Sequence, residues 1–245
     1  MSAVATVGRP HHHYGRTDST NARAKALAQA GAPGGTVVTA DEQTAGRGRQ
    51  GRSWFAQPGT ALLYSALLRT LGDRPLLPLA APLAVCEACE ALAPVRCEVK
   101  WPNDVWIEGR KVAGVLIEAR PDEGWAVIGV GLNVAVPPEA FPPELRATAM
   151  SLGSNRLPTL ADALDALNGC LARWLDAAEG EILESFRARD ALRGRRLAWD
   201  GGEGIAAGID DAGHLLVESG GDEPLRLGAG EVHLAVGDPA SGRSG

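Results

Sequence analysis

The stretch GRGRQGR, residues 46–52, combines three glycines with three arginines and follows a polar run at residues 41–44. Glycine lets a backbone approach a ligand closely and adopt positive φ at little steric cost. Arginine presents a planar fork of donors that matches the oxygens of phosphate and carboxylate groups. The stretch therefore predicts a loop that closes over an anion, although such a short run is, taken alone, more often a flexible basic surface loop.

The composition excludes several classes of protein. The chain has 245 residues, of which 45% are hydrophobic, enough for one large domain or for a main domain with a small one. Its 24 basic and 30 acidic residues give a net charge of −6, which argues against non-specific nucleic-acid binding as the main task. The sequence contains neither a signal peptide nor an apolar run long enough to span a membrane. We therefore expect a soluble, cytoplasmic protein with no membrane partner.

The four cysteines are too few and too irregularly spaced for a disulfide framework. Cys86 and Cys89 form a CxxC pair inside an apolar helical run, with no second pair and no histidine nearby. We expect them to be buried free thiols on one helix face rather than metal ligands.

Hydrophobic periodicity and turn residues predict a chain of mixed helices and strands. After a strand entry at residues 11–13, the expected strands cover residues 35–40, 62–68, 95–100, 105–107, 112–118 and 125–134. Helices are expected at residues 22–30, from about 79 to 93, and across 160–175, where leucines recur at helical spacing. From residue 194 onward, five short runs separated by glycine and aspartate predict a small β-barrel.

Residues outside the loop indicate the same kind of site. Lys100 ends a predicted strand just before a Trp-Pro pair, which restricts the backbone, so it is either a charge aimed at a ligand or half of a surface salt bridge. Gly114, Gly129 and Gly131 interrupt strands, where a ligand approaches or a bulge occurs. The polar run 18–21 is either a helix cap or a place to hold a small polar ligand. Together with the arginines, these residues favour an acidic ligand such as a nucleotide.

Five motifs, in this order, closely resemble the biotin–protein ligase family, also called biotin–[acetyl-CoA-carboxylase] ligases. They comprise residues 18–21 with Gln43, 46–52, 100–104, 111–118 and 128–133. The resemblance implies an α+β fold: a central mixed β-sheet with helices on one side, of the class II aminoacyl-tRNA synthetase and biotin ligase type, then a small C-terminal SH3-like barrel. The expected organisation is a flexible N-terminus (1–13), a catalytic biotin- and ATP-binding domain (14–190), the barrel (191–237) and a disordered tail (238–245).

The activity that the resemblance implies has two steps. Biotin and ATP, with Mg²⁺, give biotinyl-5′-AMP and pyrophosphate, and the biotinyl group then passes to one lysine of a biotin carboxyl carrier protein of acetyl-CoA carboxylase or a related carboxylase. Homodimerisation is possible in such a family. A DNA-binding role is not expected, because only thirteen residues precede Tyr14.

The resemblance also implies roles for individual residues. Lys100, Arg47 and Arg49 are expected to be catalytic, and Asn133 is expected near the nucleotide and its metal, for which no protein ligand is assigned. The full expected biotin and adenylate set is Ser19, Thr20, Asn21, Gln43, Gly46, Arg47, Gly48, Arg49, Arg52, Trp54, Lys100, Gly114, Leu116, Gly129, Gly131 and Asn133. Around residues 147–150, where some relatives carry an adenine-stacking tryptophan, this sequence has no aromatic residue, so no adenine contact is assigned.

Two other functions are compatible with parts of the pattern. A lipoate– or octanoate–protein ligase or transferase shares the fold and a key lysine, but typically carries Arg-Arg and Gly-Gly-Gly in place of the GRGRQGR loop. A non-catalytic biotin-binding regulator would need neither Lys100 nor the loop arginines. A generic nucleotide-binding protein is disfavoured because no GxxxxGK[ST] loop is present.

Overall fold

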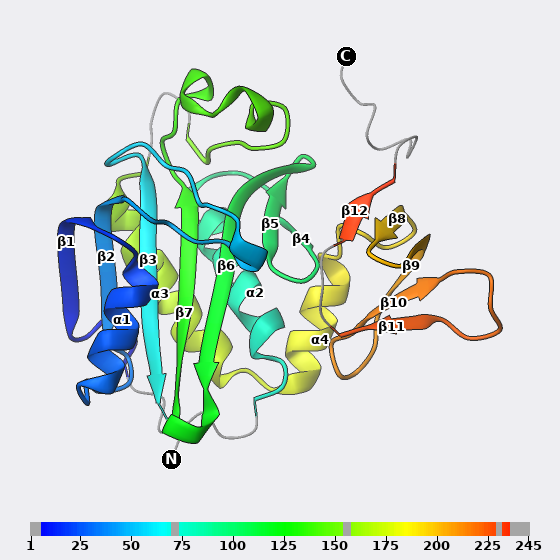
Figure 1. Ribbon diagram of the computed structural model, residues 1–245, viewed down its shortest axis with the longest axis horizontal. Coiled ribbons are helices and arrows are strands. Elements are labelled where there is room, and N and C mark those ends of the chain that lie inside the picture. The colour runs from blue at the N-terminus through cyan, green and yellow to red at the C-terminus, as the bar shows by residue number, and fades with distance from the viewer. Residues whose placement is uncertain (1–5, 70–73, 154–157, 229–231, 236–245) are drawn as a thin grey trace.

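A seven-stranded sheet forms the centre of the computed structural model, which describes residues 6–69, 74–153, 158–228 and 232–235 (Figure 1). Its strand order is β1-β2-β3-β7-β6-β5-β4. The strands are β1 (His11–Thr17), β2 (Val37–Gln43), β3 (Ala61–Arg69), β4 (Glu98–Lys100), β5 (Asp104–Ile107), β6 (Arg110–Arg120) and β7 (Trp125–Asn133). β1 runs parallel to β2 and the other pairs are antiparallel, so the predicted mixed sheet is confirmed.

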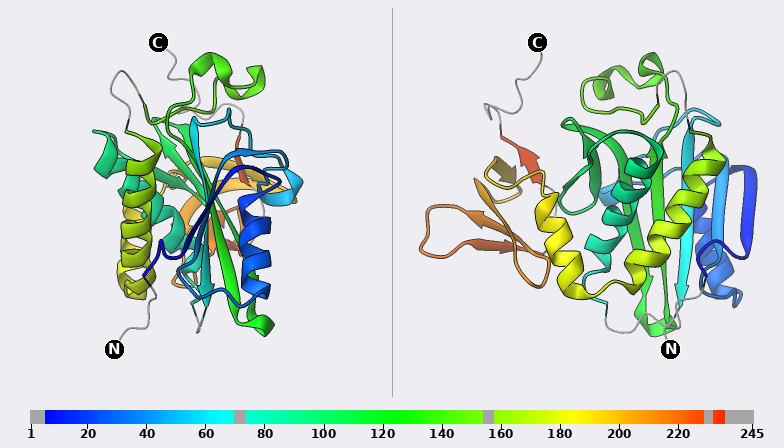
Figure 2. Two further views of the ribbon diagram at one scale, coloured as in Figure 1. Left: turned by 90° about the vertical axis from the view of Figure 1, so that its left-hand side faces the viewer. Right: turned by 180° about the vertical axis from the view of Figure 1, so that it is seen from behind.

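Helices cover both faces of this sheet, and not one side as the resemblance implied (Figure 2). The α-helices are α1 (Thr20–Gln29), α2 (Leu77–Leu92), α3 (Leu160–Asp176) and α4 (Glu179–Ala188), and the short 3-10 helices are η1 (Arg49–Gly51), η2 (Pro121–Glu123), η3 (Pro138–Ala140) and η4 (Pro143–Leu145). On α1 the small residues Ala24 and Ala28 are buried against Val38 and Val127 of the sheet. This second, smaller core lies between α1 and the sheet, and α2 and α3 pack on the opposite face.

The main core lies between the sheet and helices α2 and α3. As the leucine spacing predicted, Leu167, Leu171 and Trp174 of α3 are buried in it. Cys86 and Cys89 of α2 are buried free thiols, which confirms their prediction. This side of the sheet is therefore filled with apolar side chains, and the chemistry-bearing residues lie on the side of α1.

The five predicted C-terminal strands are confirmed as a second, antiparallel sheet in the order β11-β10-β9-β8-β12. They are β8 (Arg196–Trp199), β9 (Gly202–Ile209), β10 (Leu215–Glu218), β11 (Leu225–Leu227) and β12 (Val232–Leu234). The indole N–H of Trp101 donates to the carbonyl of Gly213 at 3.1 Å, which joins this sheet to the strand end that carries Lys100. The segment that joins α4 to β8 also supports β4, because the N–H of Val99 donates to the carbonyl of Arg189 at 2.7 Å.

The chain ends differ from the prediction at one point. β1 begins at His11 and Val7 is buried, so the segment 1–13, expected to be flexible, includes the start of a strand. The predicted tail, 238–245, lies outside the described residues. Within the described part of the chain, no helix combines the length and apolarity needed to cross a membrane.

Candidate active site

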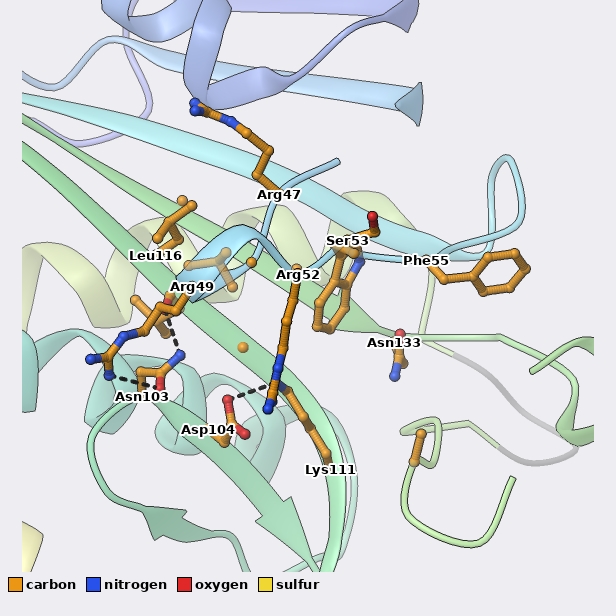
Figure 3. A pocket seen from close by; sticks show the side chains of 18 of the residues that line it. Arg47, Arg49, Arg52, Ser53, Phe55, Asn103, Asp104, Lys111, Leu116 and Asn133 are labelled. Carbon is orange, nitrogen blue, oxygen red and sulfur yellow. Dashed lines mark hydrogen bonds and ion pairs between the residues drawn. The ribbon is translucent and has the colours of Figure 1, made fainter. Parts of the chain in front are cut away.

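A pocket of about 390 Å³ opens over β6 and β7, between the start of α1, the 46–52 loop and the β4–β5 turn (Figure 3). Its wall contains every residue of the expected set except Gly46: Ser19, Thr20, Asn21, Gln43, Arg47, Gly48, Arg49, Arg52, Trp54, Lys100, Gly114, Leu116, Gly129, Gly131 and Asn133. Gly46, the first residue of the loop, lines an adjoining hollow. Segments spread over more than a hundred positions of the sequence therefore meet in one cavity, as the motif order predicted.

The polar end of the pocket is organised by hydrogen bonds within the protein. The side-chain oxygen of Gln43 accepts from the backbone N–H of Thr20 at 2.7 Å and from its hydroxyl at 3.1 Å. The hydroxyl of Ser65 donates to Oδ1 of Asn21 at 2.6 Å. Ser19 occupies the N-cap position of α1 but makes no capping bond with its side chain. Gln43, from a distant strand, therefore satisfies a free N–H of the helix start, and these polar groups are oriented before any ligand arrives.

The strand glycines are explained by side chains of the site. A Cβ atom at Gly129 would lie 2.2 Å from Oδ1 of Asn21, and one at Gly131 would lie 2.3 Å from the ring of Trp54. At Gly114 the nearest atoms would be Lys111 at 3.1 Å and Trp54 at 3.2 Å. The absence of a side chain at these positions lets Asn21 and Trp54 lie directly on the sheet, which is how the floor of the pocket is built.

Two lysines face the pocket from the sheet. The ammonium of Lys100 lies 5.4 Å from the ring centroid of Trp106, which orients it at the end of β4. Lys111 pairs with Asp104 at 2.6 Å and lies 5.7 Å from the centroid of the Trp54 ring. The pocket is thus lined by fixed positive charge on the side of the β4–β5 turn, as a carboxylate or phosphate ligand requires.

The three loop arginines do not share one direction (Figure 3). Arg49 donates to Oδ1 of Asn103 at 3.2 Å, and Arg52 extends toward Asp104. Arg47, expected to face the ligand with Arg49, instead pairs with Glu118 at 3.0 Å. The carboxylate of Glu118 holds the guanidinium of Arg47, although Arg47 still contributes to the pocket wall.

The end of the pocket around Asn133 was predicted only in part, because Asn133 was expected there but its apolar neighbours were not. Asn133 is only 3% exposed; its amide nitrogen donates to the carbonyl of Met150 at 3.0 Å, while its Oδ1 has no hydrogen-bond partner among the described residues. Phe141 and Leu145 line the cavity at this end. The sequence interpretation treated residues 137–143 only as a proline-rich link. The apolar residues Phe141, inside it, and Leu145, just after it, were the signal that could have indicated a pocket wall. An aromatic side chain is therefore present, although not at 147–150.

Comparison with known proteins agrees with this geometry. Residues 14–134 match the Biotin/lipoate A/B protein ligase family. The chain is 37% identical to the biotin--[acetyl-CoA-carboxylase] ligase of Mycobacterium tuberculosis, covering 89% of this chain and 87% of that protein. It is 36% identical to the bifunctional ligase/repressor BirA of Bacillus subtilis, covering 82% of this chain and 67%, about two thirds, of that protein.

Solved structures give the same result. Biotin protein ligase from Aquifex aeolicus, in complex with biotin and ATP, superposes with a TM-score of 0.78 at 27% identity, covering 93% of this chain and 99% of that chain. The Leishmania major biotin protein ligase in complex with biotinyl-5-AMP gives a TM-score of 0.64 at 26% identity, covering 90% and 99%. The fold and the site define a ligase of the biotin and lipoate class. Within that class, the chain belongs to the biotin protein ligase family.

Proposed function

We propose that this protein is an ATP-dependent biotin–[acetyl-CoA-carboxylase] ligase, which forms biotinyl-5′-AMP and transfers the biotinyl group to a lysine of a biotin carboxyl carrier protein. One observation carries the proposal: a single pocket joins a pre-oriented neutral polar end to an end lined by cations. Biotin has a neutral ureido ring and an anionic carboxylate, and the two ends match these two groups.

The ureido ring is assigned to the start of α1. Asn21 and the Thr20–Gln43 pair supply neutral donors and acceptors there. Thr20 and Asn21 are buried, so a polar ligand group without matching partners would be rejected. The apolar tail of biotin then follows the glycine-lined floor between Leu116 and Trp54. This path leads its carboxylate toward Lys100.

Lys100 and Arg49 are assigned to the first chemical step. The biotin carboxylate attacks the α-phosphorus of ATP, an acyl-phosphate bond forms, and the bond to the pyrophosphate leaving group breaks. Attack brings two anions together, and the cations of Lys100 and Arg49 neutralise them, so no protein nucleophile is needed. For the second step, in which the lysine amine of the carrier displaces AMP, no residue is assigned as the base.

Mg²⁺ enters with ATP as part of the substrate. This ion is commonly held by one or two carboxylates together with phosphate oxygens and water. Among the described residues, no group of three or more His, Cys, Asp or Glu side chains is placed to hold a metal. Asp104 is engaged with Lys111. We therefore assign most of the metal ligands to the triphosphate of ATP and place Asn133 near the bound nucleotide and its metal.

The adenine base is assigned to the end formed by Asn133, Phe141 and Leu145. The unpartnered Oδ1 of Asn133 is a buried acceptor, and the exocyclic amine of adenine is a donor that would satisfy it.

Asn133→Ala is expected to raise the KM for ATP about tenfold, because one hydrogen bond to a buried group is lost. Inosine triphosphate lacks that amine, so the wild-type protein should discriminate against it and the variant should not. Equal discrimination by both proteins would place the base elsewhere.

Arg49→Gly is expected to let the adenylate escape. The guanidinium contributes charge to the ligand and ties the loop to Asn103, so its loss removes both an attraction and a contact that keeps the loop closed. Free adenylate acylates exposed lysines, and the variant should label bystander albumin where the wild type does not. Arg226→Gly, an exposed change on β11, is the matched control and should label only the carrier. Unchanged selectivity of Arg49→Gly would contradict this role.

The test of the function itself is substrate-dependent exchange of pyrophosphate into ATP. Biotin should support exchange, while lipoate and octanoate should not. Exchange with lipoate or octanoate alone would favour a lipoate– or octanoate–protein ligase, and biotin binding without exchange would favour a regulator. A homodimer, a cytoplasmic location and the absence of a DNA partner remain predictions.

A further inference from the structure

Glu118 lies outside the pocket, and three side chains from α1 and the loop donate to its carboxylate. It belongs to β6 and its side chain is 25% exposed. Oε1 accepts from the ammonium of Lys25 at 2.7 Å. Oε2 accepts from the amide nitrogen of Asn21 at 2.9 Å and from Arg47 at 3.0 Å. Asn21 and Lys25 belong to α1 and Arg47 to the loop, so one carboxylate joins the sheet, the helix and the loop.

The carboxylate of Glu118 is ionised at neutral pH. Burial alone would raise its pKa, but hydrogen bonds from Lys25 and Asn21 and the charges of Lys25 and Arg47 outweigh burial and lower the pKa below its ordinary value. Charge-assisted hydrogen bonds at a partly buried site are stronger than those of a fully exposed ion pair. Glu118 therefore holds the side chains of Lys25 and Arg47 in place.

The loop is a small hairpin that its own backbone holds together. Arg47 forms a bridge with Ser53, and the N–H of Gly48 donates to the carbonyl of Arg52 at 2.7 Å. Side-chain bonds then tie the hairpin to the rest of the protein on two flanks, from Arg47 to Glu118 and from Arg49 to Asn103. Figure 3 shows that Arg47 points to the opposite side from Arg49. The Arg47 contact is thus suited to fixing the loop and not to touching the reacting groups.

The same carboxylate sets the orientation of Asn21. Because the amide nitrogen of Asn21 donates to Glu118, its Oδ1 faces Ser65 and the backbone of Gly129. With the amide turned over, Oδ1 of Asn21 would face the carboxylate of Glu118, two acceptors with no proton between them. Glu118 therefore determines which polar atom of Asn21 is turned toward the pocket floor.

We propose that Glu118 is a positioning residue that holds the loop over the adenylate through Arg47 and fixes the amide of Asn21. This inference rests on the proposed ligase function. Glu118 reaches no reacting atom, and it acts on how long the adenylate is retained more than on how fast the adenylate forms. The charge neutralisation that speeds formation is assigned to Lys100 and Arg49.

Glu118→Gln tests this role, since glutamine keeps the volume and an oxygen for Asn21 while losing the charge that holds Lys25 and Arg47. The enzyme is loaded with biotin and radiolabelled ATP, and release of labelled adenylate is followed after a chase with unlabelled substrate. Release is expected to be about tenfold faster than in the wild type. Biotin-dependent pyrophosphate exchange is expected to change less than about threefold. A general structural defect would lower exchange as much as it raises release.

Arg47→Met supplies the other half of the test, because methionine keeps an apolar stem and leaves α1 and Glu118 untouched. It should accelerate release to a similar extent, and the double variant should release no faster than either single variant. Glu184→Gln, an exposed change on α4, should alter neither rate. Unchanged release in Arg47→Met, additive effects in the double variant, or equal losses of exchange and retention in Glu118→Gln would each overturn the proposal. Failure of the ligase function itself would appear separately, as no exchange in the wild type.

Discussion

Replacing Lys100 by alanine is expected to abolish adenylate formation, with biotin-dependent pyrophosphate exchange falling at least about a hundredfold. Lys100 lies at the end of β4 in the pocket wall, where we assign the meeting of the biotin carboxylate and the α-phosphate of ATP. Two loop arginines are engaged elsewhere, because Arg47 is paired with Glu118 and Arg49 donates to Asn103. Removing this cation takes away one of the two positive charges assigned to neutralise the biotin carboxylate and the α-phosphate as they approach each other.

Lys100→Met is the matched variant, since it keeps an apolar stem beside Trp106 and removes only the charge. It should lose exchange as completely as the alanine variant, while thermal unfolding of both stays close to that of the wild type. Arg196→Met, which removes an exposed cation from β8, should exchange normally. Exchange at the wild-type rate in Lys100→Met would show that the positive charge is not what drives the step.

Most of the residues that line the pocket could be predicted, but the directions of some side chains could not. Local patterns were sufficient for the leucine face of α3, for strands interrupted by glycine and for a basic glycine loop, because each depends on neighbours in the sequence. The direction of Arg47 depends on Glu118, a carboxylate seventy-one positions away. That pairing exists only once β6 lies beside the loop, so periodicity and spacing carry no record of it.

The same limit explains two other differences. The position of α1 on the face opposite α2 and α3 follows from the small core that Ala24 and Ala28 form with Val38. An alanine-rich helix is compatible with either face of a sheet, and the amphipathicity of α1 is too weak to choose. Phe141 became part of the pocket because the segment after β7 folds back onto β6, where the N–H of Met150 donates to the carbonyl of Lys111 at 2.9 Å.

Gly129→Ala is expected to weaken biotin binding about a hundredfold, although it adds only one methyl group. The new Cβ would lie 2.2 Å from Oδ1 of Asn21, far inside van der Waals contact. Asn21 cannot move aside cheaply, because Ser65 and Glu118 hold both ends of its amide in a buried position. Displacing it breaks this network and leaves buried polar groups unpaired at the end of the pocket assigned to the ureido ring. Isothermal titration with biotin measures the loss.

Gly169→Ala is the matched control, because glycine is again replaced by alanine but a Cβ there meets no atom within 4 Å and the position lies inside α3. It should bind biotin normally and stabilise the protein by up to about 1 kcal/mol through helix propensity. A second comparison isolates the clash: in an Asn21→Ala background, where the obstructing amide is gone, adding Gly129→Ala should cost little further affinity. Full additivity of the two substitutions would mean that Gly129 acts on biotin directly and not through Asn21. The ligand itself would then require the glycine at this position, and not the Asn21 side chain that lies on it.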